Sequence, residues 1–176
     1  MRCCGQKETG TLEAVLEFTR KSLLYDIGNY LYIEGSAMDR GTDVHNRHLV
    51  QDGTEEGNSD RITRVLNLAH ARAVEMLYPY SKQEVTEPYR TECCLPEPKV
   101  YEILMRVPET FSQTTLDYLE KLVREWLVAT AVSDWLSLTL TPRKAVWDEK
   151  ISELESEIRS IINLRRSRLT RRMHPF

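Results

Sequence analysis

The residue types that could carry chemistry are four histidines and four cysteines. His45 and His48 stand three residues apart, and this spacing could hold a metal ion only on a helix, where such residues share a face. Glycines on both sides of the pair favour a solvated loop instead. His70 has no adjacent acidic partner that would orient it as a general base, so we interpret it as a partly exposed helical histidine.

The cysteines form two adjacent pairs, Cys3-Cys4 and Cys93-Cys94. Adjacent cysteines lack the two-residue spacer that lets two thiolates reach one zinc ion, so reduced structural thiols are the favoured interpretation. The sequence also contains no glycine-rich phosphate loop and no serine elbow. We therefore expect no enzymatic activity, no metal and no cofactor. A small metal-dependent enzyme or regulator stays as an alternative that would need ligand spacing the sequence does not show.

Composition and length set limits on the class of protein. A chain of 176 residues with 41% hydrophobic residues can bury one ordinary core, so we expect one domain. No apolar run reaches the roughly 18 residues of a membrane span, and the first residues lack the apolar region of a signal peptide. These features predict a soluble, cytoplasmic protein that does not enter a membrane.

Charge is distributed unevenly along the chain. The formal net charge is -3, but five arginines lie between positions 165 and 172 with no acidic residue among or after them. Without them, 19 basic residues face 27 acidic residues, a balance of -8. A general nucleic-acid binder would carry a basic binding face on its body as well. The pattern therefore predicts a basic tail, residues 165–176, attached to an acidic domain.

Two helices are predicted in the first half of the chain. Apolar residues at near-helical spacing predict the first over residues 11–33, with Thr9 or Thr11 as the N-cap and a possible break near Gly28. The second spans residues 58–78, begins at Asn58 or Ser59 and ends at Pro79. Between them, residues 35–59 are polar and glycine-rich, which predicts a long acidic surface loop, and residues 1–10 are expected to be flexible.

The spacing of apolar residues then changes. Residues 83–94 and 99–107 are rich in β-branched and aromatic residues that roughly alternate, which predicts a β-hairpin over residues 83–107. Two strands alone are marginally stable in water, so either the helices or a neighbouring subunit must cover them. We expect the hairpin to contribute to a subunit interface, and the candidate residues are Tyr89, Tyr101, Ile103 and Met105.

Two long helices joined by a short turn are predicted next. The first begins after a cap at Ser112 or Thr114, and the second begins at Thr141-Pro142 and extends to about residue 164. Trp126, Trp135 and Trp147 have helical spacing, so core packing is the default.

Asp134 lies on the most apolar helix, and we favour a partner for it, either a tryptophan N–H or an arginine. The predicted fold class is mainly α: a helical bundle over residues 11–164 with a long αα-hairpin, one inserted β-hairpin and an extended basic C-terminal tail.

Several stretches resemble known proteins. The order of elements and the segments "NSDRITRVLNLAH", "EMLYPY", "PETFSQTTLDYLEKL", "DWLSLT" and the terminal "HPF" resemble a group of uncharacterised virion proteins of tailed bacteriophages and prophages. The resemblance covers most of the chain from Leu24 onward. The size and helical layout are similar to those of the head-tail connector, or adaptor, proteins of the phage neck.

This resemblance implies a function, a location and partners. Connector proteins form a ring, usually of twelve subunits, beneath the portal. Their C-terminal segment docks on the portal, while the ring surrounds the DNA channel and contacts the next neck or tail protein. By the resemblance, this chain would be a homo-oligomeric structural protein of the virion neck, present in the host cytoplasm during assembly and close to packaged DNA without specific binding. The partner-binding residues would be Arg165, Arg166, Arg168, Arg171, Arg172, Met173, His174, Pro175 and Phe176.

The residues of the tail support docking on a protein. Arginine pairs bidentately with carboxylates, and Met173, Pro175 and Phe176 can fill an apolar cleft but would gain nothing from a phosphate backbone. Two alternatives stay open. The tail could be an ordinary frayed terminus, or it could be the basic arm of a nucleic-acid-binding helical protein whose affinity falls steeply with salt.

Overall fold

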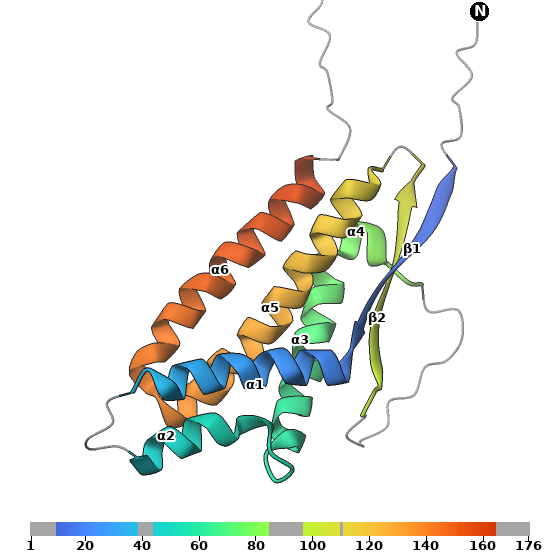
Figure 1. Ribbon diagram of the computed structural model, residues 1–176. Coiled ribbons are helices and arrows are strands. Elements are labelled where there is room, and N and C mark those ends of the chain that lie inside the picture. The colour runs from blue at the N-terminus through green and yellow to red at the C-terminus, as the bar shows by residue number, and fades with distance from the viewer. Residues whose placement is uncertain (1–9, 39–43, 85–96, 110, 165–176) are drawn as a thin grey trace, which may run out of the picture.

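A computed structural model of the chain describes residues 10–38, 44–84, 97–109 and 111–164. The described residues fold around one core, and most of them are helical (Figure 1). In chain order the elements are β1 (Thr11–Thr19), α1 (Arg20–Ser36), α2 (Val44–Gln51), the short 3-10 helix η1 (Asp52–Thr54), α3 (Ser59–Met76), α4 (Tyr78–Ser81), β2 (Val100–Pro108), α5 (Gln113–Thr139) and α6 (Thr141–Leu164). The predicted mainly-α fold class is confirmed.

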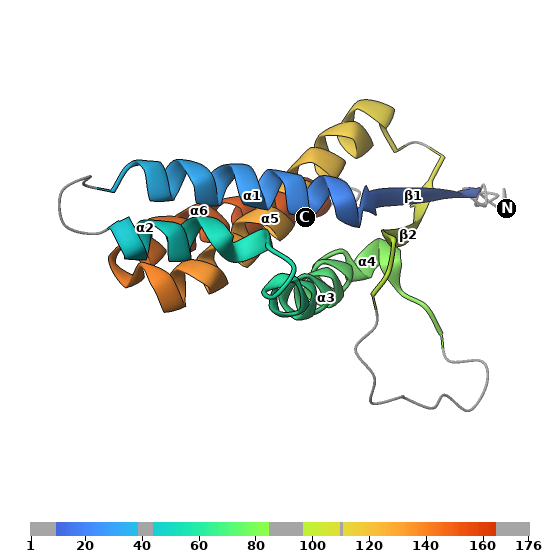
Figure 2. The ribbon, with the colours of Figure 1, turned by 60° about the horizontal axis from the view of Figure 1, so that its bottom comes forward.

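Helices α5 and α6 form the predicted αα-hairpin. Ser112 occupies the N-cap position of α5, and α6 begins at Thr141 with Pro142 in its first turn, where proline costs no hydrogen bond. The three tryptophans of the hairpin are buried, as their spacing predicted. Helix α5 lies in the middle of the fold, because α1, α2, α3 and α6 all pack against it (Figures 1 and 2).

Helix α3 also matches its prediction. Asn58 occupies its N-cap position, and the helix ends at Met76, just before Pro79 enters the short helix α4. The residues it buries are Ile62, Thr63, Leu66, Ala69 and Ala73, which recur at the spacing of one helix face.

The two strands correct one prediction and refine another. Residues 11–19 form a strand, so the helix predicted over residues 11–33 begins only at Arg20. The strand predicted over residues 99–107 exists as β2, but its partner is β1, which runs antiparallel with Thr11 opposite Pro108 and Thr19 opposite Val100. The first strand of the predicted hairpin falls mostly on residues 85–96, outside the described residues.

One face of this sheet belongs to the core. Leu16 lies opposite Ile103 and Phe18 opposite Tyr101, and all four side chains are buried. On the outer face, Glu17 lies opposite Glu102. Core-facing and outward-facing residues therefore alternate along each strand, with the period of two that is typical of a strand buried on one face.

The predicted acidic loop of residues 35–59 is largely helical, which corrects that prediction. Helix α2 and η1 occupy residues 44–54 and pack on α1 and α5. Val50 is fully buried, and its carbonyl oxygen accepts a hydrogen bond from Trp135 Nε1 at 3.0 Å. Gly53 lies against the side chains of Leu31 and Trp135, and a Cβ atom at this position would clash with Leu31 Cδ1, so a larger residue would force its neighbours to shift. Residues 39–43 lie outside the described residues.

Candidate assembly surfaces

The residues predicted to bind a partner through the tail, positions 165–176, lie outside the described residues. The structure does describe where the tail starts. Helices α5 and α6 run in opposite directions. Tyr118 of α5 donates a hydrogen bond to Glu157 of α6, and Glu125 of α5 pairs with Lys150 of α6. A residue of α5 therefore lies level with the residue of α6 whose number is about 275 minus its own. Leu164 therefore lies level with the first turn of α5, at one end of the molecule (Figure 1).

A buried carboxylate fixes α6 to α1. The Glu34 side chain is only 8% exposed, and Arg143 donates to both its oxygens, Nε to Oε2 at 2.8 Å and Nη2 to Oε1 at 3.1 Å. Trp147 Nε1 donates to the same carboxylate at 3.0 Å. Burial raises the pKa of Glu34, but the hydrogen bonds from Arg143 and Trp147 outweigh burial and hold the pKa below its usual value. The group is therefore ionised at neutral pH and its acceptors are occupied.

A second polar cluster joins α1, α5 and α6. Glu125 accepts hydrogen bonds from Tyr30 at 2.7 Å and from Lys150, whose Nζ also lies 4.7 Å from the centroid of the Tyr30 ring. Burial raises the pKa of Glu125, and the hydrogen bonds from Lys150 and Tyr30 lower it further than burial raises it. These polar contacts thus tie the three helices together.

The candidate subunit interface on the strand is corrected by the structure. Tyr101, Ile103 and Met105 are at most 3% exposed, because the inner face of β2 packs on the chain's own helices. Side chains in the core cannot also be covered by a second chain. Tyr89 lies outside the described residues. The signal that misled the sequence prediction was apolar content, which does not distinguish a core face from an interface.

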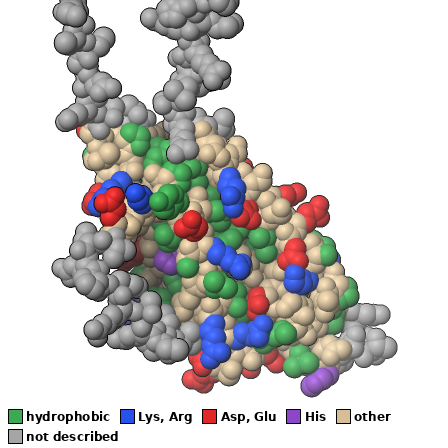
Figure 3. Space-filling view, turned by 180° about the vertical axis from the view of Figure 1, so that it is seen from behind, with side chains coloured by type: hydrophobic (Ala, Val, Ile, Leu, Met, Phe, Trp, Pro, Cys, Tyr) green, Lys and Arg blue, Asp and Glu red, His purple; other side chains and the backbone are tan. Residues whose placement is uncertain are grey.

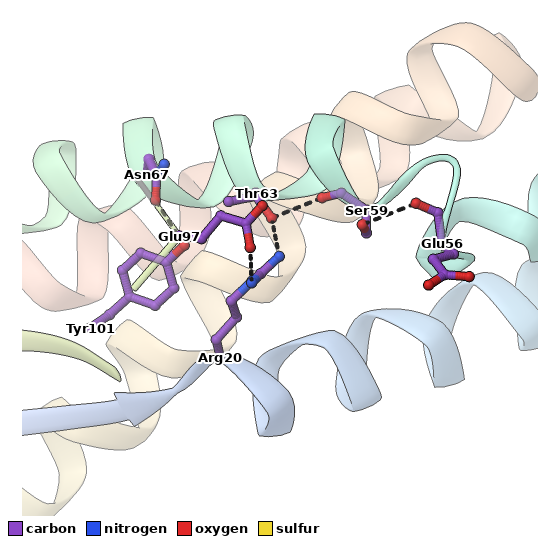
Figure 4. Close-up of polar contacts among 7 residues, drawn as sticks. All are labelled: Arg20, Glu56, Ser59, Thr63, Asn67, Glu97 and Tyr101. Atoms are coloured by element: carbon purple, nitrogen blue, oxygen red, sulfur yellow. Dashed lines mark hydrogen bonds and ion pairs between the residues drawn. The ribbon is translucent and has the colours of Figure 1, made fainter. Parts of the chain in front are cut away.

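Polar contacts hold the sheet on α3 (Figure 4). The Tyr101 hydroxyl donates to Asn67 Oδ1 at 2.8 Å. Where β1 passes into α1, Arg20 Nη2 donates to the Thr63 hydroxyl at 2.7 Å and Arg20 Nη1 pairs with Glu97 at 3.1 Å. These contacts cross element boundaries, so the cluster positions the sheet on α3 and the start of α1. Arg20 Nε is buried without a hydrogen-bond partner among the described residues.

His45, His48 and His70, the three histidines among the described residues, do not share a site. His70 is half-buried, and one of its ring nitrogens lies 3.0 Å from the Glu102 carbonyl oxygen. Burial lowers its pKa and the hydrogen bond to Glu102 raises it, with a net lowering, so the ring is neutral at neutral pH and donates its N–H to that carbonyl. His45 and His48 do lie on a helix, contrary to the loop interpretation. No set of three or more metal-ligating side chains is found among the described residues, so these two have no third ligand there.

Asp134 has the partner that its position on α5 predicted. Arg61 Nε and Nη2 donate to its Oδ2 at 3.1 and 2.9 Å. Asp134 lines a groove of about 850 Å³ formed by α3, α5 and α6, and Trp126 is also part of the lining. Charged residues of both signs line this groove, and on the back of the molecule Lys and Arg side chains also alternate with Asp and Glu (Figure 3).

A second groove differs in charge. It has a volume of about 540 Å³ and lies between β1 and the first two turns of α5. We call it the acidic groove, because its lining contains four carboxylates and no lysine or arginine. The four are Glu13, Glu17, Asp117 and Glu120.

Comparison with protein-family models, with curated proteins and with solved structures found no match to this chain. Within the ranges that the structure describes, no helix is both long and apolar enough to cross a membrane.

Proposed function

We propose that the chain is a structural virion protein of a tailed phage. It forms a ring, most simply of twelve copies, that joins the portal to the tail and surrounds the DNA channel. Its C-terminal segment, residues 165–176, docks on the portal, and the opposite face of the ring meets the next neck or tail protein. The proposal is supported by the resemblance of the sequence to virion proteins of tailed phages, by a size and helical layout similar to those of neck connectors, and by the place where helix α6 ends.

One observation carries the proposal. Helix α6 is fixed to α1 by Glu34 and to α5 by Glu125, and it ends at Leu164 at one end of the molecule. The next twelve residues contain five arginines and end in a methionine, a histidine, a proline and a phenylalanine. A peptide with this composition can pair with carboxylates and fill an apolar cleft, and a rigid helix sets where it begins.

The acidic balance of the rest of the chain suits a ring around DNA. A channel lined by acidic residues does not hold the phosphate backbone, so DNA can slide through it.

The alternative function, nucleic-acid binding through the tail, is favoured only by the five arginines. Nine lysines and arginines of the described body already pair with carboxylates: Arg20, Arg61, Lys82, Arg106, Arg124, Arg143, Lys144, Lys150 and Arg159.

The experiment that tests the proposal is the mass of the purified full-length chain in solution, alone and with the portal protein of the virus that encodes it. We expect a ring-sized multiple of the chain and a complex with the portal. Replacing Met173, Pro175 and Phe176 with serine keeps every charge and should weaken the complex. A matched variant that replaces the five tail arginines with glutamine tests the charge separately.

Two results would count against portal docking. If the serine variant binds the portal normally while the glutamine variant loses affinity for DNA in a salt-dependent way, the tail is a nucleic-acid arm. If the full-length chain stays monomeric and ignores the portal under all conditions, the neck function is wrong as well.

A further inference from the structure

The acidic groove has features that suit a peptide. Glu17 and Glu120 have no cation within ion-pairing distance among the described residues, and Glu13 has only Arg106 at 3.9 Å. Glu17 also lies opposite Glu102 on the sheet, and two carboxylates in that position repel each other. A cation that entered the groove would relieve this repulsion, so the charge of the groove favours a basic ligand.

The groove also has apolar and backbone contacts to offer. Leu12 and Val15 line it and are 54% and 48% exposed. Six consecutive residues of β1, positions 12–17, take part in the lining, so the groove follows the edge of the strand and not one face alone. Among the described residues only β2 pairs with β1, which leaves the other edge with free N–H and C=O groups. An extended peptide can use such an edge.

The chain's own C-terminal segment fits these features. It contains five arginines and no acidic residue, together with Leu169, Met173 and Phe176 as apolar side chains. Guanidinium groups match carboxylates in geometry as well as in charge. The rest of the chain has a net charge of -8, so attraction between segment and body also operates over a longer range.

The segment can reach the groove within one molecule. Its first residue follows Leu164, which lies level with the start of α5, and the first two turns of α5 line the groove. At 100° per residue, Asp117 and Glu120 lie on the side of α5 away from α6, so the segment must pass around the N-terminus of α5. A helix is about 10–12 Å wide, and twelve extended residues span up to about 40 Å. Roughly half of the segment is therefore left to lie in the groove.

We infer that the acidic groove between β1 and α5 binds the C-terminal segment, residues 165–176, of the same chain. Attachment to α6 makes this a unimolecular event with an effective concentration in the millimolar range, so even weak contacts fill the groove. The inference does not rest on the proposed neck function. It has one consequence for that function: a portal that takes the segment has to displace it from the groove.

The test is disulfide formation in the full-length chain. In a background where the four natural cysteines are serine, Val15→Cys is combined with Met173→Cys, and the matched control combines Ser156→Cys on the exposed face of α6 with the same Met173→Cys. We expect the first pair to form an intramolecular disulfide about tenfold faster than the control, which corresponds to about 1.4 kcal/mol of preference. The preference should disappear when the salt is raised from about 0.1 M to about 1 M, where the Debye length is only about 3 Å.

Charge variants test the cause. Glu17→Gln with Glu120→Gln should slow the reaction of the Val15 and Met173 pair, whereas Glu149→Gln with Glu153→Gln, on the exposed face of α6, should leave it unchanged. Equal rates for the two cysteine pairs would overturn the inference. A disulfide that joins two molecules faster than it forms within one would also overturn it, in favour of docking on a second copy.

A second measurement needs no substitution. Hydrogen exchange of the natural full-length chain, followed by mass spectrometry, should show faster exchange of residues 12–17 and 113–120 at about 1 M salt than at about 0.1 M, because screening releases the segment. Residues 149–156 should exchange equally at both. Identical protection of the groove at both salt concentrations would overturn the inference, and the portal plays no part in either experiment, so the neck function would be unaffected.

Discussion

Replacing Trp135 with alanine should destabilise the fold strongly. Trp135 is 7% exposed, and its indole N–H donates to the Val50 carbonyl across the contact between α5 and α2. A buried tryptophan removes about 200 Å² from water, worth about 5 kcal/mol at 25 cal/mol per Å². Alanine keeps a small part of this, so we expect a loss of about 3–5 kcal/mol in the free energy of unfolding.

A second substitution at the same position separates the two contributions. Trp135→Phe keeps most of the apolar surface but leaves the Val50 carbonyl without its donor. Its cost should be about 1–3 kcal/mol, smaller than that of alanine. The matched control is Leu138→Ala on the same helix, because Leu138 is 59% exposed and its truncation should cost less than about 0.5 kcal/mol.

Urea unfolding followed by circular dichroism measures these differences, at one protomer concentration because self-association would add to stability. For a domain of this length a loss of about 4 kcal/mol also corresponds to a fall of about 8–16 °C in melting temperature. If Trp135→Ala unfolds like Leu138→Ala, the placement of Trp135 between α5 and α2 is wrong.

Two further predictions concern other parts of the core. Gly53→Ala should cost about 1–3 kcal/mol, because the new methyl group would clash with Leu31 Cδ1. Gly57→Ala, which meets nothing within 4 Å, should stay within about 0.5 kcal/mol of the parent in the same urea experiment. Glu34→Gln should destabilise the chain at neutral pH by about 1–2 kcal/mol, since Arg143 is half exposed. The folded-state pKa of Glu34 lies below its ordinary value of 4.5, so its contribution is complete above 4.5 and is lost as the pH falls through the folded pKa. The gap between parent and variant should therefore close in acid, and a gap that stays constant down to low pH would contradict the assignment.

The helices with strong local signals could be predicted from the sequence. Pro142 at the start of α6 and Pro79 after α3 mark boundaries because proline lacks a backbone N–H. Ser112 occupies the N-cap position of α5 without a side-chain capping hydrogen bond. The burial of the tryptophans followed from their helical spacing. Asp134 has the predicted arginine partner, but its side chain is 33% exposed, so the pairing does not rest on a burial cost. The unequal distribution of charge, and with it the basic tail, is a property of the sequence alone.

Only the tertiary structure determined that residues 11–19 form the strand β1 and not the start of a helix. In the segment "TLEAVLEFT" the apolar residues satisfy a period of two through Leu12, Ala14, Leu16 and Phe18. Apolar residues also continue into α1 with near-helical spacing, so the local pattern does not distinguish a strand from a helix. The choice depends on pairing with β2, whose Val100 lies opposite Thr19 although the two are far apart in the chain. A non-local hydrogen-bond partner leaves no mark in the local sequence.

Contacts between distant parts of the chain also determined helix α2 and the acidic groove. Residues 44–51 have few apolar side chains, and α2 is stabilised by contacts with α1 and α5, among them the hydrogen bond from Trp135 to Val50. The groove combines Glu13 and Glu17 with Asp117 and Glu120, which come together only because β1 packs beside the start of α5. The sequence determined which groups are charged, whereas the fold determined which of them share a surface, because proximity depends on how distant segments pack.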